Sequence, residues 1–206
     1  MNRETTVDRV ADLQRARQLS AISVGLGVVL AIIAVALGIA SGSLSMIGFG
    51  MDAAIDSAAS VVLVWRFVIE SRGQGHERAE EIAERLVSVV LLLAALALVI
   101  GAARALLLHS GAQPGAVQVA LLIVSLVALP PLAWAKRRVA DRLASNALRK
   151  DSLLTAAGAL LALVALLAGQ LGPSFGLWWA DAVGSIVIAA VLAREGSTVL
   201  RGSRTS

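Results

Sequence analysis

Six long apolar stretches leave this chain few ways to fold. A helix that crosses a bilayer needs about 20 predominantly apolar residues, and each stretch approaches or exceeds that length. Hydrophobic residues make up 58% of the chain, and the mean hydropathy is +0.83. The stretches lack the apolar and polar alternation of a barrel strand. We therefore predict an all-α polytopic membrane protein, a six-transmembrane-helix bundle with helices at about 19–40, 44–67, 84–108, 116–135, 149–170 and 176–194.

The basic residues indicate how these helices are oriented. All Lys and Arg residues except Arg104 lie in the two tails or around two connections, between helices two and three (Arg66 among them) and between helices four and five (Lys136 among them). Because basic residues concentrate on the cytoplasmic side, we expect both termini in the cytoplasm. We expect the protein to lie in the cytoplasmic membrane of a prokaryote. The predicted division is a cytoplasmic N-terminal tail (1–18), a transmembrane domain (19–200) and a cytoplasmic tail (201–206).

Composition also excludes several functions. The net charge of +4 comes from residues beside the membrane, so it favours contact with anionic lipid of the bilayer and not with nucleic acid. The chain has no cysteine, so any metal must be held by oxygen or by His76 and His109. It has no nucleotide-binding loop and no nucleophile with a histidine partner. We expect no enzymatic activity and no permanently bound cofactor.

Two aspartates interrupt the second apolar stretch, "SMIGFGMDAAIDSAASVVLVWRF" (45–67). At 1.5 Å per residue, Asp52 lies roughly 12 Å and Asp56 roughly 18 Å from the outer end of the helix. These depths bracket the middle of a hydrocarbon core about 30 Å thick. A carboxylate there costs roughly 2.5 to 3.5 kcal/mol on insertion scales, so a function is the default expectation.

The spacing of the pair points to a cation. Residues four apart share a helix face, and two carboxylates so placed repel each other in a low dielectric. A divalent cation between them removes the repulsion and expels the shared proton, so metal and protons would compete for one site. The alternative is a structural pair, in which protonated Asp52 and Asp56 donate hydrogen bonds that fix helix register.

Two further acids lie within the predicted helices. Asp151 is near the inner end of helix five, and Asp181 is near the outer end of helix six. Both are secondary candidates for metal ligation, with the hydroxyls of Thr155 and Ser185 four residues further on. Asp181 equally suits the cap of helix six, because an acidic side chain stabilises a helix N-terminus. Asp151 equally suits an ion pair with a neighbouring basic residue, Arg149 or Lys150.

Two adjacent prolines fall in the fourth stretch. Pro130 and Pro131 donate no backbone hydrogen bonds, so they should kink or break this helix. We interpret them either as a hinge or as the end of the helix, two turns early.

The chain resembles the cation diffusion facilitators, six-helix proteins that export Zn²⁺ and related ions in exchange for protons. The second stretch is similar to the family's second helix, which carries an acidic or His residue and an Asp four later, matching Asp52 and Asp56. The resemblance continues through "GQGHERAEE" (73–81), "NALRKDSLLTAAG" (146–158) and "WWADAVGS" (178–185). In typical members helix five adds a His and an Asp, but the matching positions here are Leu154 and Gly158. The usual C-terminal cytoplasmic domain is also not expected here.

In both departures the chain resembles a divergent branch of the family, the six-span zinc-efflux proteins known from animal synaptic vesicles. That branch keeps the aspartate pair and lacks the helix-five pair, and its members act as dimers. The resemblance implies a proton-coupled efflux transporter for a divalent cation, zinc in particular, acting as a homodimer. Gly25, Gly27 and Gly38 would permit close packing between copies. Two alternatives remain open, a non-transporting metal-binding regulator and a structural membrane protein.

Overall fold

The computed structural model describes residues 3–41, 44–71, 76–109, 115–176 and 178–202 of the chain. Within these ranges all regular structure is helical, which confirms the predicted fold class. The six helices are α1 (Arg3–Ser41), α2 (Leu44–Ser71), α3 (His76–Leu107), α4 (Ala116–Leu143), α5 (Asn146–Phe175) and α6 (Ala180–Gly202). Four segments of the described chain are long and apolar enough to cross a membrane: Val10–Leu37, Glu77–Leu107, Ala116–Leu143 and Asn146–Gln170.

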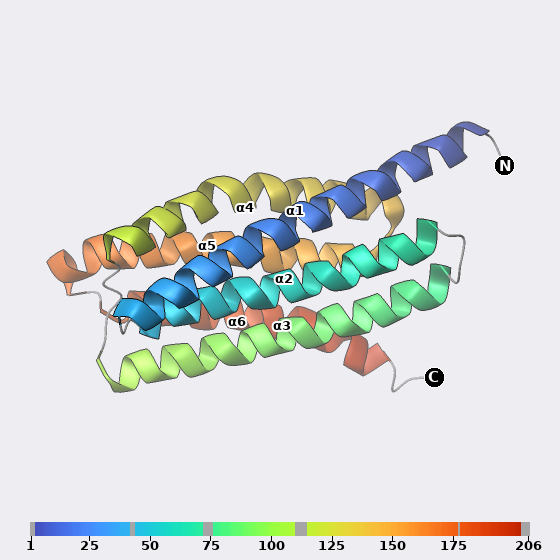
Figure 1. The fold of residues 1–206 in the computed structure, drawn as a ribbon. Coiled ribbons are helices and arrows are strands. Elements are labelled where there is room, and N and C mark those ends of the chain that lie inside the picture. Colours follow the sequence, from blue (N-terminus) through green and yellow to red (C-terminus); the bar gives the residue numbers. More distant parts are fainter. Residues whose placement is uncertain (1–2, 42–43, 72–75, 110–114, 177, 203–206) are drawn as a thin grey trace.

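The helices form an elongated bundle of roughly antiparallel neighbours (Figure 1). α1 packs mainly on α2, α3 on α6, and α4 on α5, while α2 and α3 also contact α5. The start of α1 and the end of α6 lie at the same end of the bundle as the α4–α5 turn (Figure 1). The helix ends that carry the clusters of basic residues therefore lie together at one end of the bundle.

Small residues fill the interior, and large apolar residues cover much of the outside. Ala34, Ala59 and Ala83 are fully buried, whereas Ile32 is 63% exposed and Val127 is 71% exposed. A soluble protein hides such side chains, but lipid solvates them as well as a protein core does. The distribution is therefore that of an integral membrane protein.

The α1–α2 contact depends on two glycines. A Cβ at Gly27 would collide with Ser57 Oγ and come within 3.1 Å of the Ala53 carbonyl oxygen. A Cβ at Gly50 would come within 3.0 Å of the Ala31 carbonyl oxygen. Gly27, which we expected to assist packing between copies, therefore serves the packing of α1 on α2 within the chain.

The helix boundaries correct two expectations. The prolines do not end the fourth helix, because α4 continues through Pro130 and Pro131 to Leu143. Their fixed φ suits a helix, and the surrounding bundle tolerates the lost hydrogen bonds. The first helix begins well before residue 19, since α1 is continuous from Arg3.

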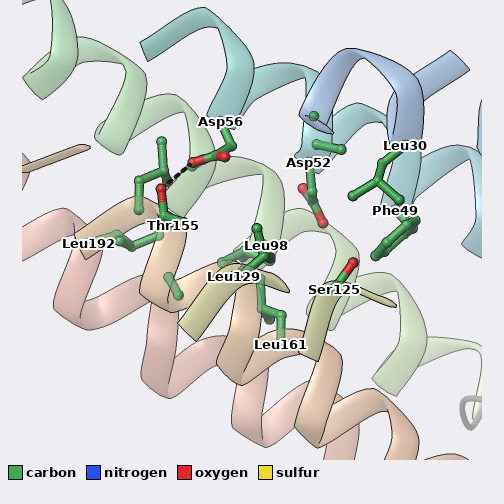
Figure 2. A pocket seen from close by; sticks show the side chains of 16 residues that line it. Leu30, Phe49, Asp52, Asp56, Leu98, Ser125, Leu129, Thr155, Leu161 and Leu192 are labelled. Carbon is green, nitrogen blue, oxygen red and sulfur yellow. Dashed lines mark hydrogen bonds between the residues drawn. The ribbon is translucent and has the colours of Figure 1, made fainter. Parts of the chain in front are cut away.

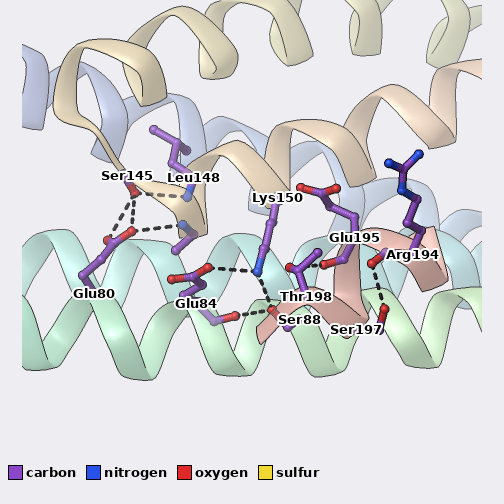
Figure 3. Close-up of polar contacts among 11 residues, drawn as sticks. Glu80, Glu84, Ser88, Ser145, Leu148, Lys150, Arg194, Glu195, Ser197 and Thr198 are labelled. Carbon is purple, nitrogen blue, oxygen red and sulfur yellow. Dashed lines mark hydrogen bonds and ion pairs between the residues drawn. The ribbon is translucent and has the colours of Figure 1, made fainter. Parts of the chain in front are cut away.

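An ion-pair cluster joins α2, α3 and α5 near the α4–α5 turn, and Figure 3 shows its contacts between α3 and the start of α5. Glu80 of α3 pairs with Arg66 of α2 and accepts hydrogen bonds from Ser145 Oγ (3.0 Å) and the Ala147 amide (3.0 Å). Ser145 in turn accepts a hydrogen bond from the Leu148 amide, as an N-cap residue does. The Glu80 carboxylate thus lies at the N-terminus of α5, where the helix dipole favours negative charge.

A second ion pair continues this connection one turn further along both helices. Lys150 Nζ of α5 lies 3.0 Å from Glu84 Oε1 and donates to Ser88 Oγ of α3 (Figure 3). Together with Glu80, these contacts hold α5 against α3. They fix the position of α5, which forms one wall of the cavity described next.

Candidate metal site

Asp52 and Asp56 lie on one face of α2 and line a cavity inside the bundle (Figure 2). Residues from all six helices line it, among them Leu30 of α1, Leu98 of α3 and Leu192 of α6. The cavity has a volume of about 70 Å³. A water molecule needs on the order of 10–15 Å³ by this measure, so the space holds several waters or a partly hydrated cation.

The wall opposite the aspartates comes from α5. Leu154, Thr155 and Gly158 all line the cavity, so α5 presents this face to the carboxylates. Leu154 and Gly158 occupy the positions at which typical cation diffusion facilitators carry metal ligands. Their side chains bind no metal, which leaves this half of the cavity apolar apart from Thr155.

Two hydroxyl groups supplement the carboxylates. Thr155 Oγ1 lies 3.3 Å from Asp56 Oδ1 and 3.1 Å from the Asp151 carbonyl oxygen, so it donates to one of the two (Figure 2). Ser125 of α4 also lines the cavity, and its buried Oγ has no hydrogen-bond partner within the part of the chain that is described. The sequence indicates Thr155 but not Ser125, because nothing in an apolar stretch shows which of its small polar residues faces inward.

The structure places Asp151 beside the cavity in an ion pair. Its Oδ2 lies 2.7 Å from Lys136 Nζ, and its Oδ1 accepts a hydrogen bond from Ser60 Oγ at 3.0 Å. The expected partners bind elsewhere, Arg149 to Asp141 and Lys150 to Glu84.

Lys136 and Arg66, which the sequence places around two connections, are buried in the bundle. Their side chains are 0% and 2% exposed. Lys136 lies beyond the span predicted for helix four, and α4 continues through it, whereas Arg66 lies in the last turns of the span predicted for helix two and points into the bundle. The burial of Lys136 was predictable only from the length of α4. A helix that continues past Pro130 and Pro131 places the Lys136 side chain inside the bundle.

Asp181 and His109 lie apart from the aspartate pair. Asp181 is half-buried in the first turn of α6. It precedes the cavity-lining Leu192 by eleven residues, or roughly 16 Å of helix. The exposed ring of His109 packs on Trp178, with 4.7 Å between the ring centroids. The side chain of His76 lies outside the described residues.

A metal at this site would have few charged protein ligands. No group of three or more His, Asp or Glu side chains that could hold a metal ion occurs among the described residues. The geometry instead combines two carboxylates, two hydroxyls and space for water. Zinc generally takes four ligands, and in sites that exchange their contents water fills the open positions. Such a set suits an ion that must enter and leave.

Comparison with known proteins identifies the domain type. The sequence of residues 20–206 matches the family model of the cation efflux transmembrane domain. No curated protein matches the chain closely enough to count as a relative. The match covers α1 from residue 20 onward, the other five helices and every residue that lines the cavity.

Proposed function

The chain belongs to the cation efflux family of metal cation transporters, and on that premise we propose that it exports divalent cations, zinc foremost, in exchange for protons. Asp52 and Asp56 are the proposed primary ligands. The observation that carries the proposal is that both carboxylates line one cavity within the bundle, large enough for a partly hydrated ion. The preference for zinc rests on the resemblance to the divergent zinc-efflux branch.

Proton coupling follows from the chemistry of the pair. A divalent cation requires both carboxylates to be ionised, whereas without it their repulsion favours retention of a proton. One site then carries metal in one direction and protons in the other. We further propose a homodimer with both tails in the cytoplasm. The basic ends of the helices, gathered at one end of the bundle, support this orientation.

The other two candidate acids have secondary roles in this proposal. Asp151 can reach a metal only after its ion pair with Lys136 opens. Asp181 lies about three helical turns before Leu192, the α6 residue that lines the cavity, so it would act at the outer exit or as a helix cap. The transmembrane domain at 19–200, with its two flanking tails, remains our proposed division of the chain.

Reconstituted protein provides the test. We expect wild-type vesicles with an imposed proton gradient to transport zinc in the direction opposite to the protons, and Asp52→Asn/Asp56→Asn to lose both zinc binding and flux. Asp141→Asn is the matched control, because the Asp141 side chain is 51% exposed and lies outside the cavity. A double variant that transports like wild type would refute the proposal. Zinc binding without flux in wild type would indicate the regulator, and neither binding nor flux would indicate a structural protein.

A further inference from the structure

Lys136 is a buried cation close to the proposed site. Its side chain is 0% exposed, and Nζ lies 2.7 Å from Asp151 Oδ2. The ammonium also donates to Ser23 Oγ (2.7 Å), Thr155 Oγ1 (2.9 Å) and Ser60 Oγ (3.1 Å). These partners belong to α1, α2 and α5, so one charge on α4 contacts three other helices. Buried ammonium groups require such pairing, because an unpaired one carries a large desolvation cost.

A single hydroxyl separates this cation from the cavity. Thr155 Oγ1 accepts a hydrogen bond from Lys136 and lies 3.3 Å from Asp56 Oδ1. The ammonium therefore acts on Asp56 across two hydrogen-bond lengths in a low dielectric. At such a distance, unit charges in a protein interior interact strongly enough to change an equilibrium constant by about tenfold or more.

The charges near the cavity balance a divalent ion. Asp52, Asp56 and Asp151 supply three negative charges when ionised, and Lys136 supplies one positive charge. Two net negative charges remain, which is the number that a divalent cation neutralises. Without Lys136, the Asp151 carboxylate beside the cavity would lose its counter-charge, and a movement of its side chain would bring it to the ion.

We propose that Lys136 is a fixed counter-cation that keeps Asp151 out of the metal's coordination and thereby limits how tightly the site holds its ion. This inference rests on the proposed function and adds a positioning residue to it. A transport site must release its cargo, so an internal cation that competes for a carboxylate serves transport. The alternative is that Lys136 only joins helices.

Three variants separate these roles. Lys136→Met removes the repulsive charge and frees Asp151, so we expect zinc affinity to rise at least about tenfold. Asp151→Asn leaves the ammonium with Asp56 as its remaining carboxylate neighbour, so we expect zinc affinity to fall at least about tenfold. Lys136→Met/Asp151→Asn removes the pair without changing the net charge, and we expect affinity within about threefold of wild type. The measurement is calorimetric titration of the detergent-solubilised full chain with zinc chloride.

The direction of the change in zinc affinity distinguishes the two roles of Lys136. If Lys136 only joins helices, both single variants weaken zinc binding together, and that result would overturn the inference. Unchanged affinity in both would overturn it as well. If Lys136→Met does not fold, the test is made in the Asp151→Asn background, where adding Lys136→Met must tighten zinc binding at least about tenfold. Wild-type protein that binds no zinc would overturn the proposed function along with this inference, whereas zinc-binding wild type with the wrong variant pattern overturns this inference alone.

Discussion

Replacing Arg66 by Met should destabilise the bundle far more than the same replacement at Arg85. The Arg66 side chain is 2% exposed, and it pairs with Glu70 at 3.0 Å and with Glu80. Removing it takes one cation away from two largely buried carboxylates, and breaking a buried ion pair costs about 3–5 kcal/mol. Arg85 pairs with Glu81 at 2.6 Å, but both side chains are more than half exposed. Water replaces that contact, so its loss should cost no more than about 1 kcal/mol.

The assay is reversible unfolding in mixed micelles of increasing SDS content, followed by tryptophan fluorescence. It yields the free energy of unfolding for wild type and for both variants. Arg85→Met controls for the loss of one positive charge near the same end of the bundle. Equal losses in the two variants, or a larger loss for Arg85→Met, would refute the claim that burial determines the contribution of these pairs.

Two further predictions concern the glycine contact and the apolar wall of the cavity. Gly27→Leu should lower the free energy of unfolding by about 1–3 kcal/mol through overpacking against α2, whereas Gly25→Leu, with no atom within 4 Å of its Cβ position, should leave it nearly unchanged in the same micelle assay. Leu154→His/Gly158→Asp should raise zinc affinity at least about tenfold in calorimetry, because both positions line the cavity opposite the aspartates and two added ligands replace water. A Cβ at Gly158 would lie 3.3 Å from the end of the Leu129 side chain, which must shift slightly to accommodate it. Unchanged affinity would show that these positions do not reach the ion.

The sequence was sufficient for the fold because apolar length alone identifies helices in a membrane. Helix four shows where this reasoning stops. Its apolar stretch ends near residue 135, yet α4 continues to Leu143, because hydrogen bonding inside the bundle sustains a helix beyond its lipid-facing part. A hydropathy pattern marks contact with lipid and not the end of a helix. The apolar pattern therefore places Lys136 beside a connection, although its side chain is buried in the bundle.

The candidate site was predictable to a similar degree. Asp52 and Asp56 stand out because carboxylates are costly in an apolar stretch, and both line the cavity. The phase of α5 was also accessible, since the position of Thr155 relative to Asp151 placed the two on one face. The inward direction of Ser125 and the partner of Asp151 were not accessible. Both depend on how α4 rotates against α5, which is decided by side-chain packing between helices and leaves no periodic trace in the sequence.

The missing helix-five ligands and the buried ion pair have one electrostatic consequence. Leu154 and Gly158 bring no charge to the cavity, and Lys136 neutralises Asp151 beside it. In the proposed mechanism, the ion then faces only the two charges of Asp52 and Asp56. A divalent cation and two carboxylates form a neutral set, which a low-dielectric interior tolerates better than any charged one. A third ionised carboxylate would deepen binding and slow release, so the loss of ligands from α5 favours turnover over retention.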